Sequence, residues 1–314
     1  MASVTIGVFG DNAEARQHIA SQLAKKSTPE DITVYQTVYS GKIISIIEPT
    51  KYPEKVASMA YAAYLSDYCI ISGEALTPFL GETIIALDLL GKKNGCFITS
   101  LDLKPMIKGT SLENYPIFAT FEEAKQEILA FSPEKGVFRD TFGSIDHSFE
   151  VKGIGSILLG FLHTGKISVH DRLTVHPSGK ELEVRSIQMH DEDVKETNEG
   201  DRFGLAIKLL ASKDVGRGDF VCGQNTKILA SKNQGMKIEA AKFLKEPLKP
   251  LEQIHAFQFL EDMPCKWDGP ELQAGKNAAG MLVFEKEFAL NPNYPVLLAR
   301  LDGKGLRIIA KAVP

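Results

Sequence analysis

Residues 10–17 have the spacing of a phosphate-binding loop but lack the residue types that bind phosphate. Such a loop reads G-x-x-x-x-G-K-[ST], and its backbone N–H groups and lysine meet the phosphate charge. The eight residues here read Gly-Asp-Asn-Ala-Glu-Ala-Arg-Gln. Ala15 adds a Cβ where the backbone must approach the ligand. Asp11 and Glu14 add two negative charges against the one positive charge of Arg16, so a triphosphate would meet unsuitable chemistry.

The elements around this loop alternate between strand and helix patterns through the first third of the chain. An apolar run at 4–9 precedes the loop, and a helical pattern follows it. Further strands are expected at 32–38, 42–48, 68–73 and 95–102, and helices at 53–65, 80–93 and 121–131. Alternation of this kind predicts a mostly parallel sheet covered by helices on both faces.

The pattern changes after residue 136, where short strands follow one another with little helix. Glycine and aspartate turns between short apolar runs are typical of small β-barrels. A lysine-rich stretch at 226–237 is expected to be a connector, and a second β-rich segment follows it. We therefore expect an α/β domain at 1–136 and two β-barrels at 137–226 and 227–314.

Length and composition exclude several classes of protein. The 314 residues suit two or three domains, and a net charge of −4 argues against a strong polyanion binder. The four cysteines are far apart, which predicts buried free thiols in a reducing cytosol and no metal site. The chain shows neither a secretory signal nor an apolar run near the roughly 20 residues that cross a bilayer. We expect a cytoplasmic protein without a membrane partner.

Residues 145–221 strongly resemble the second domain of translational GTPases. The resemblance rests on the F-x-V-K-G-x-G segment, the GK-x-x-V-x-D turn, VRSIQ-x-H, and a G-D-R followed by RGD. It is greatest to archaeal SelB, the selenocysteine-specific elongation factor family within the elongation factor Tu superfamily. The resemblance implies a Rossmann-like, P-loop GTPase-type α/β domain followed by two β-barrels, which are the second and third domains of translation factors.

The first nucleotide-binding motif of that family is altered at three positions. The family loop resembles GHVDHGKT, of which Gly10 retains the first glycine. Ala15 stands for the second glycine, Arg16 for the lysine, and Gln17 for the threonine that binds Mg²⁺.

Two further nucleotide motifs are altered as well. The family DTPGH becomes Glu48-Pro49-Thr50-Lys51-Tyr52, and the guanine-reading N-K-x-D becomes Thr99-Ser100-Leu101-Asp102. Lys51 replaces the glycine whose amide meets the γ-phosphate, and Tyr52 replaces the histidine that positions water. We expect a pseudo-GTPase that binds neither GTP nor Mg²⁺ and has no catalytic residue. The alternative is divergent nucleotide binding with residual GTPase activity, in which Glu48 holds a metal through water and Asp102 contacts a guanine edge.

Asp146, His147 and Arg202 match the positions that form the selenocysteinyl pocket in SelB. A selenol is ionised at neutral pH, so Arg202 and a protonated His147 would favour it while Asp146 orients them. The resemblance therefore implies an aminoacyl pocket at these three residues. The structural alternative is that Asp146 caps a turn and Arg202 pairs with a barrel carboxylate.

Other chemistry-bearing residues are expected to be structural. His163, His170, His176 and His190 lack zinc-ligand spacing and are interpreted as surface residues. Trp267 either stacks on a nucleotide or packs in a barrel, and we favour packing.

The resemblance implies a translation factor that has lost GTP binding and holds a tRNA or aminoacyl-tRNA through its barrels. The ribosome or other translation proteins are further expected partners, and DNA is not. The alternative is a protein-interaction scaffold that docks through an apolar patch around 49–53 and 76–80.

Overall fold

A computed structural model describes the chain apart from residues 1, 27–29, 134–139, 190–191 and 303–304. Its first domain contains β1 (Ala2–Phe9), α1 (Ala13–Leu23), β2 (Lys25–Lys26), β3 (Thr33–Tyr39), β4 (Lys42–Glu48), α2 (Val56–Leu65), β5 (Tyr68–Ser72), α3 (Pro78–Leu89), β6 (Gly95–Ile98), α4 (Lys104–Ile107), β7 (Ile117–Phe118) and α5 (Phe121–Ala130). The strands form one sheet in the order β2-β3-β4-β1-β5-β6-β7, in which β1 pairs in parallel with β4 and β5. The expected hairpin is the antiparallel pair β3–β4.

Both faces of this sheet are covered, which explains why its strands are apolar at almost every position. Ile6 and Ile46 point to the face packed by α1 and α5, whereas Phe9 and Ile71 join the core under α2 and α3. Helix α3 starts earlier than the sequence pattern indicated, because Thr77 caps it and its first residue is a proline.

The second domain is a closed antiparallel barrel. It contains β8 (Phe142–Val151), β9 (Gly155–Thr164), β10 (Lys166–Ser168), β11 (Arg172–His176), β12 (Lys180–Met189), β13 (Glu192–Val194), β14 (Glu196–Asn198), β15 (Arg202–Lys208), the 3₁₀ turn η1 (Ser212–Asp214) and β16 (Phe220–Cys222). The sheet order β11-β16-β8-β9-β15-β12-β13 closes because β11 also pairs with β12.

The third domain is a second closed barrel, with strand order β17-β20-β19-β18-β21-β22. Its strands are β17 (Leu229–Ala240), β18 (Gln253–Gln258), β19 (Glu261–Asp268), β20 (Asn277–Leu290), β21 (Val296–Ala299) and β22 (Ile308–Val313). One α/β domain followed by two barrels confirms the expected fold class.

The interpretation of 226–237 as a connector is wrong, because most of it lies in β17. Gln234, Met236, Ile238 and Ala240 alternate as buried residues with exposed neighbours along this strand. The lysines occupy the outer face, so the segment has low mean hydropathy although it belongs to the barrel. The alternation of apolar and polar residues indicates a strand here, whereas the lysine-rich composition indicated a connector.

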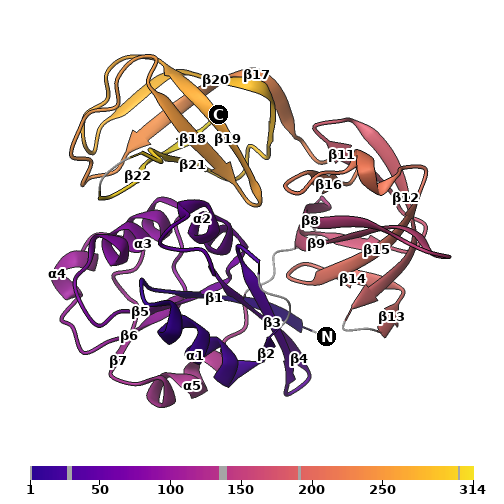
Figure 1. Cartoon of the computed structure of the whole chain (residues 1–314), viewed down its shortest axis with the longest axis horizontal. Coiled ribbons are helices and arrows are strands. Elements are labelled where there is room, and N and C mark those ends of the chain that lie inside the picture. The colour runs from indigo at the N-terminus through magenta and orange to yellow at the C-terminus, as the bar shows by residue number, and fades with distance from the viewer. Residues whose placement is uncertain (1, 27–29, 134–139, 190–191, 303–304) are drawn as a thin grey trace.

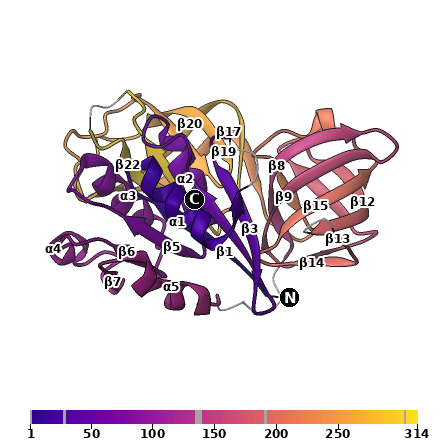
Figure 2. The ribbon, with the colours of Figure 1, turned by 60° about the horizontal axis from the view of Figure 1, so that its bottom comes forward.

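One apolar cluster contains buried residues of all three domains, in addition to the separate cores within each of them. Figure 1 shows the third barrel lying against α2 and α3, with the second barrel beside both other domains, and Figure 2 shows the same side position after rotation. The Tyr64 hydroxyl oxygen of α2 lies 2.7 Å from the carbonyl oxygens of both Phe257 and Pro295, either of which can accept its one proton, and it accepts from the Leu297 amide. Among the described residues, no helix combines the length and apolar character needed to cross a bilayer.

Two expectations about aromatic side chains are settled by burial. Trp267 is fully buried in the third barrel and donates its indole N–H to the Pro270 carbonyl, so it is not a nucleotide-stacking residue. His163 was expected at the surface but packs between Phe142 and Phe259, with ring centroids 5.3 and 4.0 Å away. That burial lowers the His163 pKa to about 3. His190 lies outside the described residues.

Candidate functional site

The loop after β1 is held by its own side chains. Asn12 caps α1, and its Oδ1 accepts hydrogen bonds from the Glu14 and Ala15 amides at 3.0 and 3.2 Å. These amides are the donors that a phosphate at a helix N-terminus would use. Gly10 has a φ of +139°, and an added Cβ would lie 2.3 Å from the Ser72 carbonyl oxygen. The retained glycine is therefore required for packing against β5.

Arg16 is fully buried, and its guanidinium fills the space between the loop and the segment after β4. Nη1 donates to the Gly10 carbonyl at 2.7 Å. Nη2 donates to the carbonyls of Pro49 and Tyr52 at 3.1 and 2.7 Å. Nε donates to Glu48 Oε1 at 3.2 Å. The Arg16 guanidinium, in the loop that we expected to be a degenerate phosphate-binding loop, thus makes four hydrogen bonds.

The remaining altered positions of the first two motifs differ in burial and contacts. Glu48 is fully buried, and its second carboxylate oxygen accepts from the Thr50 hydroxyl at 3.1 Å. Tyr52 is buried, and its hydroxyl oxygen lies 2.7 Å from the Phe79 carbonyl oxygen and 3.1 Å from Glu82 Oε1, either of which can accept its one proton. Lys51 is exposed and Gln17 is half-buried. Glu48 therefore acts as an internal partner of Arg16.

The positions that match the altered guanine-reading motif differ in their contacts. The Thr99 hydroxyl donates to the Gly73 carbonyl at 2.6 Å, and Ser100 is exposed. Asp102 accepts from the Lys104 amide at 3.2 Å, at the start of α4. The Thr99 side chain thus connects the end of β6 to the segment after β5, whereas Asp102 stabilises its own turn.

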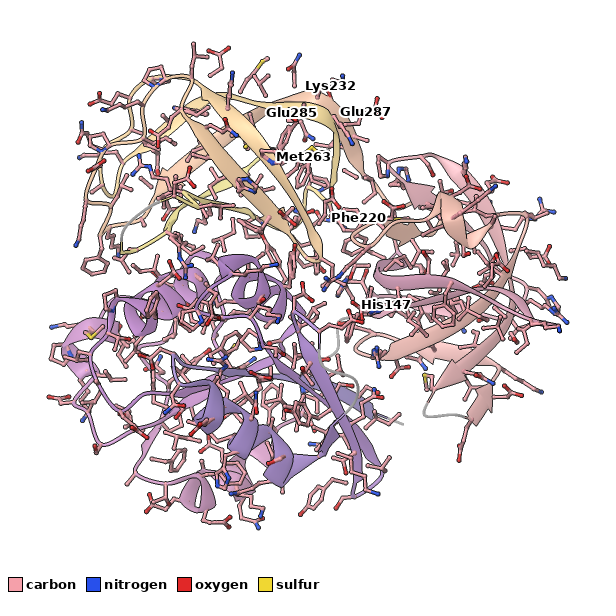
Figure 3. The ribbon with its side chains drawn as sticks, viewed as in Figure 1. His147, Phe220, Lys232, Met263, Glu285 and Glu287 are labelled. Atoms are coloured by element: carbon pink, nitrogen blue, oxygen red, sulfur yellow. The ribbon has the colours of Figure 1, made fainter. Side chains whose placement is uncertain are left out.

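Asp146, His147 and Arg202 converge on one site in the second barrel. A β-bulge between Ile145 and His147 inserts Asp146 into β8 and brings neighbouring side chains to one side. Asp146 is buried, with Oδ2 at 3.0 Å from His147 Nδ1 and 3.6 Å from Arg202 Nη2. Figure 3 shows His147 on the side of the barrel that faces the first domain.

Electrostatics make His147 a cation at neutral pH. Its hydrogen bond to Asp146 and the neighbouring Glu30 carboxylate raise the His147 pKa to about 9, against the lowering effect of burial. Burial alone would raise the Asp146 pKa, but His147, Arg217 and Arg202 together hold it below its usual value. The site therefore contains one buried carboxylate beneath three cationic groups.

Three residues of this site were missed by sequence reasoning. Arg217 lies with Nε 3.5 Å from Asp146 Oδ1, and its Nη1 donates to Asp31 of the first domain at 2.7 Å. Glu30, also of the first domain, has both carboxylate oxygens 2.9 Å from His147 Nε2. The RGD triplet signalled Arg217 only as part of a motif, and no local pattern marks two carboxylates that act across a domain boundary.

The site opens into a cavity between the first and second domains. The cavity has a volume of about 200 Å³. Its lining residues are Glu30, Ile32, Val34, Asp146, His147, Phe149, Leu159 and Arg202. Phe149, Leu159 and Arg202 also line a neighbouring groove of about 760 Å³ on the second barrel. Arg202 Nε is buried and has no hydrogen-bond partner among the described residues. The arrangement places a cationic donor where the cavity and the neighbouring groove share lining residues.

The amino-acid sequence of this chain is similar to those of known proteins. Residues 155–222 match the family model described as elongation factor Tu domain 2. The chain is 32% identical over 271 residues to an uncharacterized protein of Methanocaldococcus jannaschii, covering 84% of this chain and 86% of the relative. It is 24% identical over 298 residues to the selenocysteine-specific elongation factor of the same organism, covering 81% of this chain but 64% of that factor.

Solved structures show the same fold over nearly the whole chain. The translation elongation factor SelB of Methanococcus maripaludis in its apo form superposes with a TM-score of 0.82 at 19% identity, covering 99% of this chain and 79% of SelB. The same factor in complex with the GTP analogue GppNHp also gives a TM-score of 0.82, at 20% identity, covering 100% of this chain and 79% of SelB.

Proposed function

The chain belongs to the elongation factor Tu superfamily as a SelB-like member, and from this premise we propose that it is a translation factor that has lost GTP binding. In this proposal its barrels hold an aminoacyl-tRNA or another translation component. The open cluster around Asp146 supports the proposal most directly, because it joins the first domain to the second at a cavity.

The occupied loop supports the loss of GTP binding. A triphosphate at this loop would have to displace the Arg16 guanidinium from four hydrogen bonds, one of which is the ion pair with Glu48. Breaking a buried ion pair costs about 3–5 kcal/mol, before the repulsion from Asp11 and Glu14 is added. The Asn12 cap already engages the Glu14 and Ala15 amides of α1, so these two donors are not free to offset that cost.

Arg202 is the group best suited to contact an aminoacyl ligand. Arg217 also has buried nitrogens, Nε and Nη2, without a hydrogen-bond partner among the described residues, but it is paired with Asp31 through Nη1 and is not among the residues that line the cavity, whereas Arg202 is. His147 is paired with Glu30 and Asp146. Arg202 has one long contact with Asp146 and an unpartnered Nε, so a ligand oxygen or ionised selenol would complete its hydrogen bonding. The neighbouring groove offers Phe149 and Met189 as apolar walls and Gln188 as a polar group for the terminal nucleoside.

Two measurements test this proposal. Calorimetry with Mg²⁺ and GTP should give no binding at micromolar concentrations, and a micromolar dissociation constant would exclude the loss of GTP binding. Protein purified from its host should retain tRNA that can be sequenced, with an Arg202→Ala variant retaining less. Arg172→Ala, an exposed change on the same barrel, is the matched control. The absence of enriched RNA would count against the tRNA role.

The scaffold alternative depended on an apolar patch around 49–53 and 76–80. Pro49, Tyr52 and Leu80 are buried, and Leu76 is the exposed large apolar residue of the two segments. A single exposed leucine is ordinary for a protein surface. This observation does not favour docking through that face.

A further inference from the structure

We infer that the Arg16 side chain is a built-in substitute for nucleotide, which permanently holds the third domain against the first. In switch GTPases, the γ-phosphate and its Mg²⁺ order the segments that follow the phosphate loop, and hydrolysis releases them. Here the covalently attached guanidinium contacts the corresponding segment, residues 48–52, from the loop side. The inference rests on the closed nucleotide site of the proposed function and adds a conformational consequence.

The segment held by Arg16 also forms part of the interface with the third domain. Tyr52 lies at its end, and the Tyr52 hydroxyl is within hydrogen-bond distance of the Phe79 carbonyl and of Glu82, both in α3. The carbonyl of Pro53 accepts a hydrogen bond from Arg307 Nη1 of the third domain at 2.8 Å. The same segment is therefore bonded to one arginine from the first domain and another from the third.

Arg307 fixes the third domain from the opposite side of this segment. Its Nη2 donates to Glu82 Oε1 at 2.6 Å, while its Nε and its backbone amide both donate to Oε2, at 3.0 and 2.7 Å. The guanidinium carbon lies 5.7 Å from the Tyr52 ring centroid and 5.6 Å from that of Phe79. Tyr52 thus contacts both arginines: its carbonyl accepts from Arg16, and its ring lies beside the Arg307 guanidinium.

Burial makes this connection resistant to solvent. Arg16, Glu48 and Glu82 are 0% exposed, Tyr52 is 1% exposed, and Arg307 is 8% exposed. Buried hydrogen-bonded charges are costly to separate, because each group left behind would be uncompensated. A ligand shifts a conformational equilibrium only through different affinity for its two states. With Arg16 attached to the chain, no nucleotide is needed to favour the docked arrangement.

Hydrogen exchange of the full chain tests the inference. The Tyr52 and Lys55 amides donate to carbonyls within 49–51, and the Arg307 amide donates to Glu82 across the interface. In Arg16→Ala, peptides containing 48–55 and Arg307 should exchange at least tenfold faster than in the wild type, while second-barrel peptides remain unchanged. Millimolar guanidinium should restore slow exchange, and the same concentration of urea, which is uncharged, should not.

A second variant keeps the test decisive if Arg16→Ala folds poorly. Arg16→Lys retains the charge but not the planar fork, so it should accelerate the same two peptides by a smaller factor. Unchanged exchange at Arg307, or equal acceleration in all three domains, would overturn the inference. If wild-type protein binds GTP, the closed site of the proposed function fails. If it binds no GTP and the Arg16 variants exchange like wild type, only the present inference fails.

Discussion

Arg307 of the third domain and Glu82 of α3 form a buried ion pair, with 2.6 Å between Nη2 and Oε1 and 3.0 Å between Nε and Oε2. Two guanidinium nitrogens donate to the two oxygens of the Glu82 carboxylate, and the Arg307 backbone amide is a third donor to the same carboxylate. Docking of the third barrel onto the first domain therefore depends on a charged contact as well as on apolar packing.

Arg307→Ala should destabilise the protein by about 3–5 kcal/mol, because it leaves the Glu82 carboxylate buried without its cation. Urea unfolding monitored by circular dichroism measures this change. Lys311→Ala is the matched control, since Lys311 forms a partly exposed pair with Glu239 on the same barrel. That control should cost less than about 1 kcal/mol. Equal effects of the two substitutions would contradict the special role of Arg307.

Sequence reasoning identified the altered nucleotide motifs but not the contacts that the altered residues make. The substitution of lysine by Arg16 was visible, yet its acceptors at 48–52 come from a separate element that only the folded sheet brings near. Asp146, His147 and Arg202 were identified through the family resemblance, because all three lie within the barrel that the resemblance covers. Glu30 and Arg217 were missed because their contacts depend on how two domains dock, which local patterns do not encode.

The protonated His147 should make stability depend on pH between 6.5 and 9. Its folded pKa of about 9 lies above the ordinary value of 6.5, so its contribution is complete below pH 6.5 and is lost as pH rises through 9. Because the side chain is 35% exposed, we expect about 1–2 kcal/mol after allowing for solvent screening.

Thermal unfolding of wild type and His147→Gln across this range measures the contribution of His147. The difference between the two proteins should be largest near pH 6 and small near pH 10. Asp146 and Glu30 face His147 directly, and Arg202 and Arg217 face Asp146. A pH-independent difference would mean that His147 contributes packing and not charge.

Glu261 should lower the stability of the protein at alkaline pH. Burial, followed by the charges of Asp219 and Asp262, raises its pKa to about 8 from 4.5. The folded state then holds a proton that the unfolded state releases, so stability falls as pH rises from 4.5 to 8. Glu261→Gln should raise the melting temperature at pH 8.5 more than at pH 5. Glu54→Gln, at an exposed position, should change neither value.

Arg202→Ala should weaken binding of an aminoacyl-tRNA more than binding of the same tRNA without its amino acid. The reason is geometric, because the cavity beside Asp146 is separate from the larger groove and Arg202 borders both. Loss of the guanidinium would remove the donor to the aminoacyl group while leaving the groove walls intact. Filter binding with charged and uncharged tRNA gives the affinity ratio, which should fall about tenfold for a lost charge-assisted hydrogen bond of about 1.4 kcal/mol.

The structural alternative predicts the reverse pattern for the same variant. If Arg202 serves only to neutralise Asp146, its removal should lower stability and leave the affinity ratio unchanged. The 3.6 Å contact with Asp146 is long, and His147 and Arg217 remain beside that carboxylate, so we expect a stability loss below that of Arg307→Ala. Arg202→Lys separates charge from shape, since it retains the cation but loses the planar fork. A lowered ratio in both variants, with near-native melting, would identify Arg202 as a ligand-contacting residue. An unchanged ratio with lowered melting would leave the pocket as inherited architecture that no longer distinguishes the amino acid.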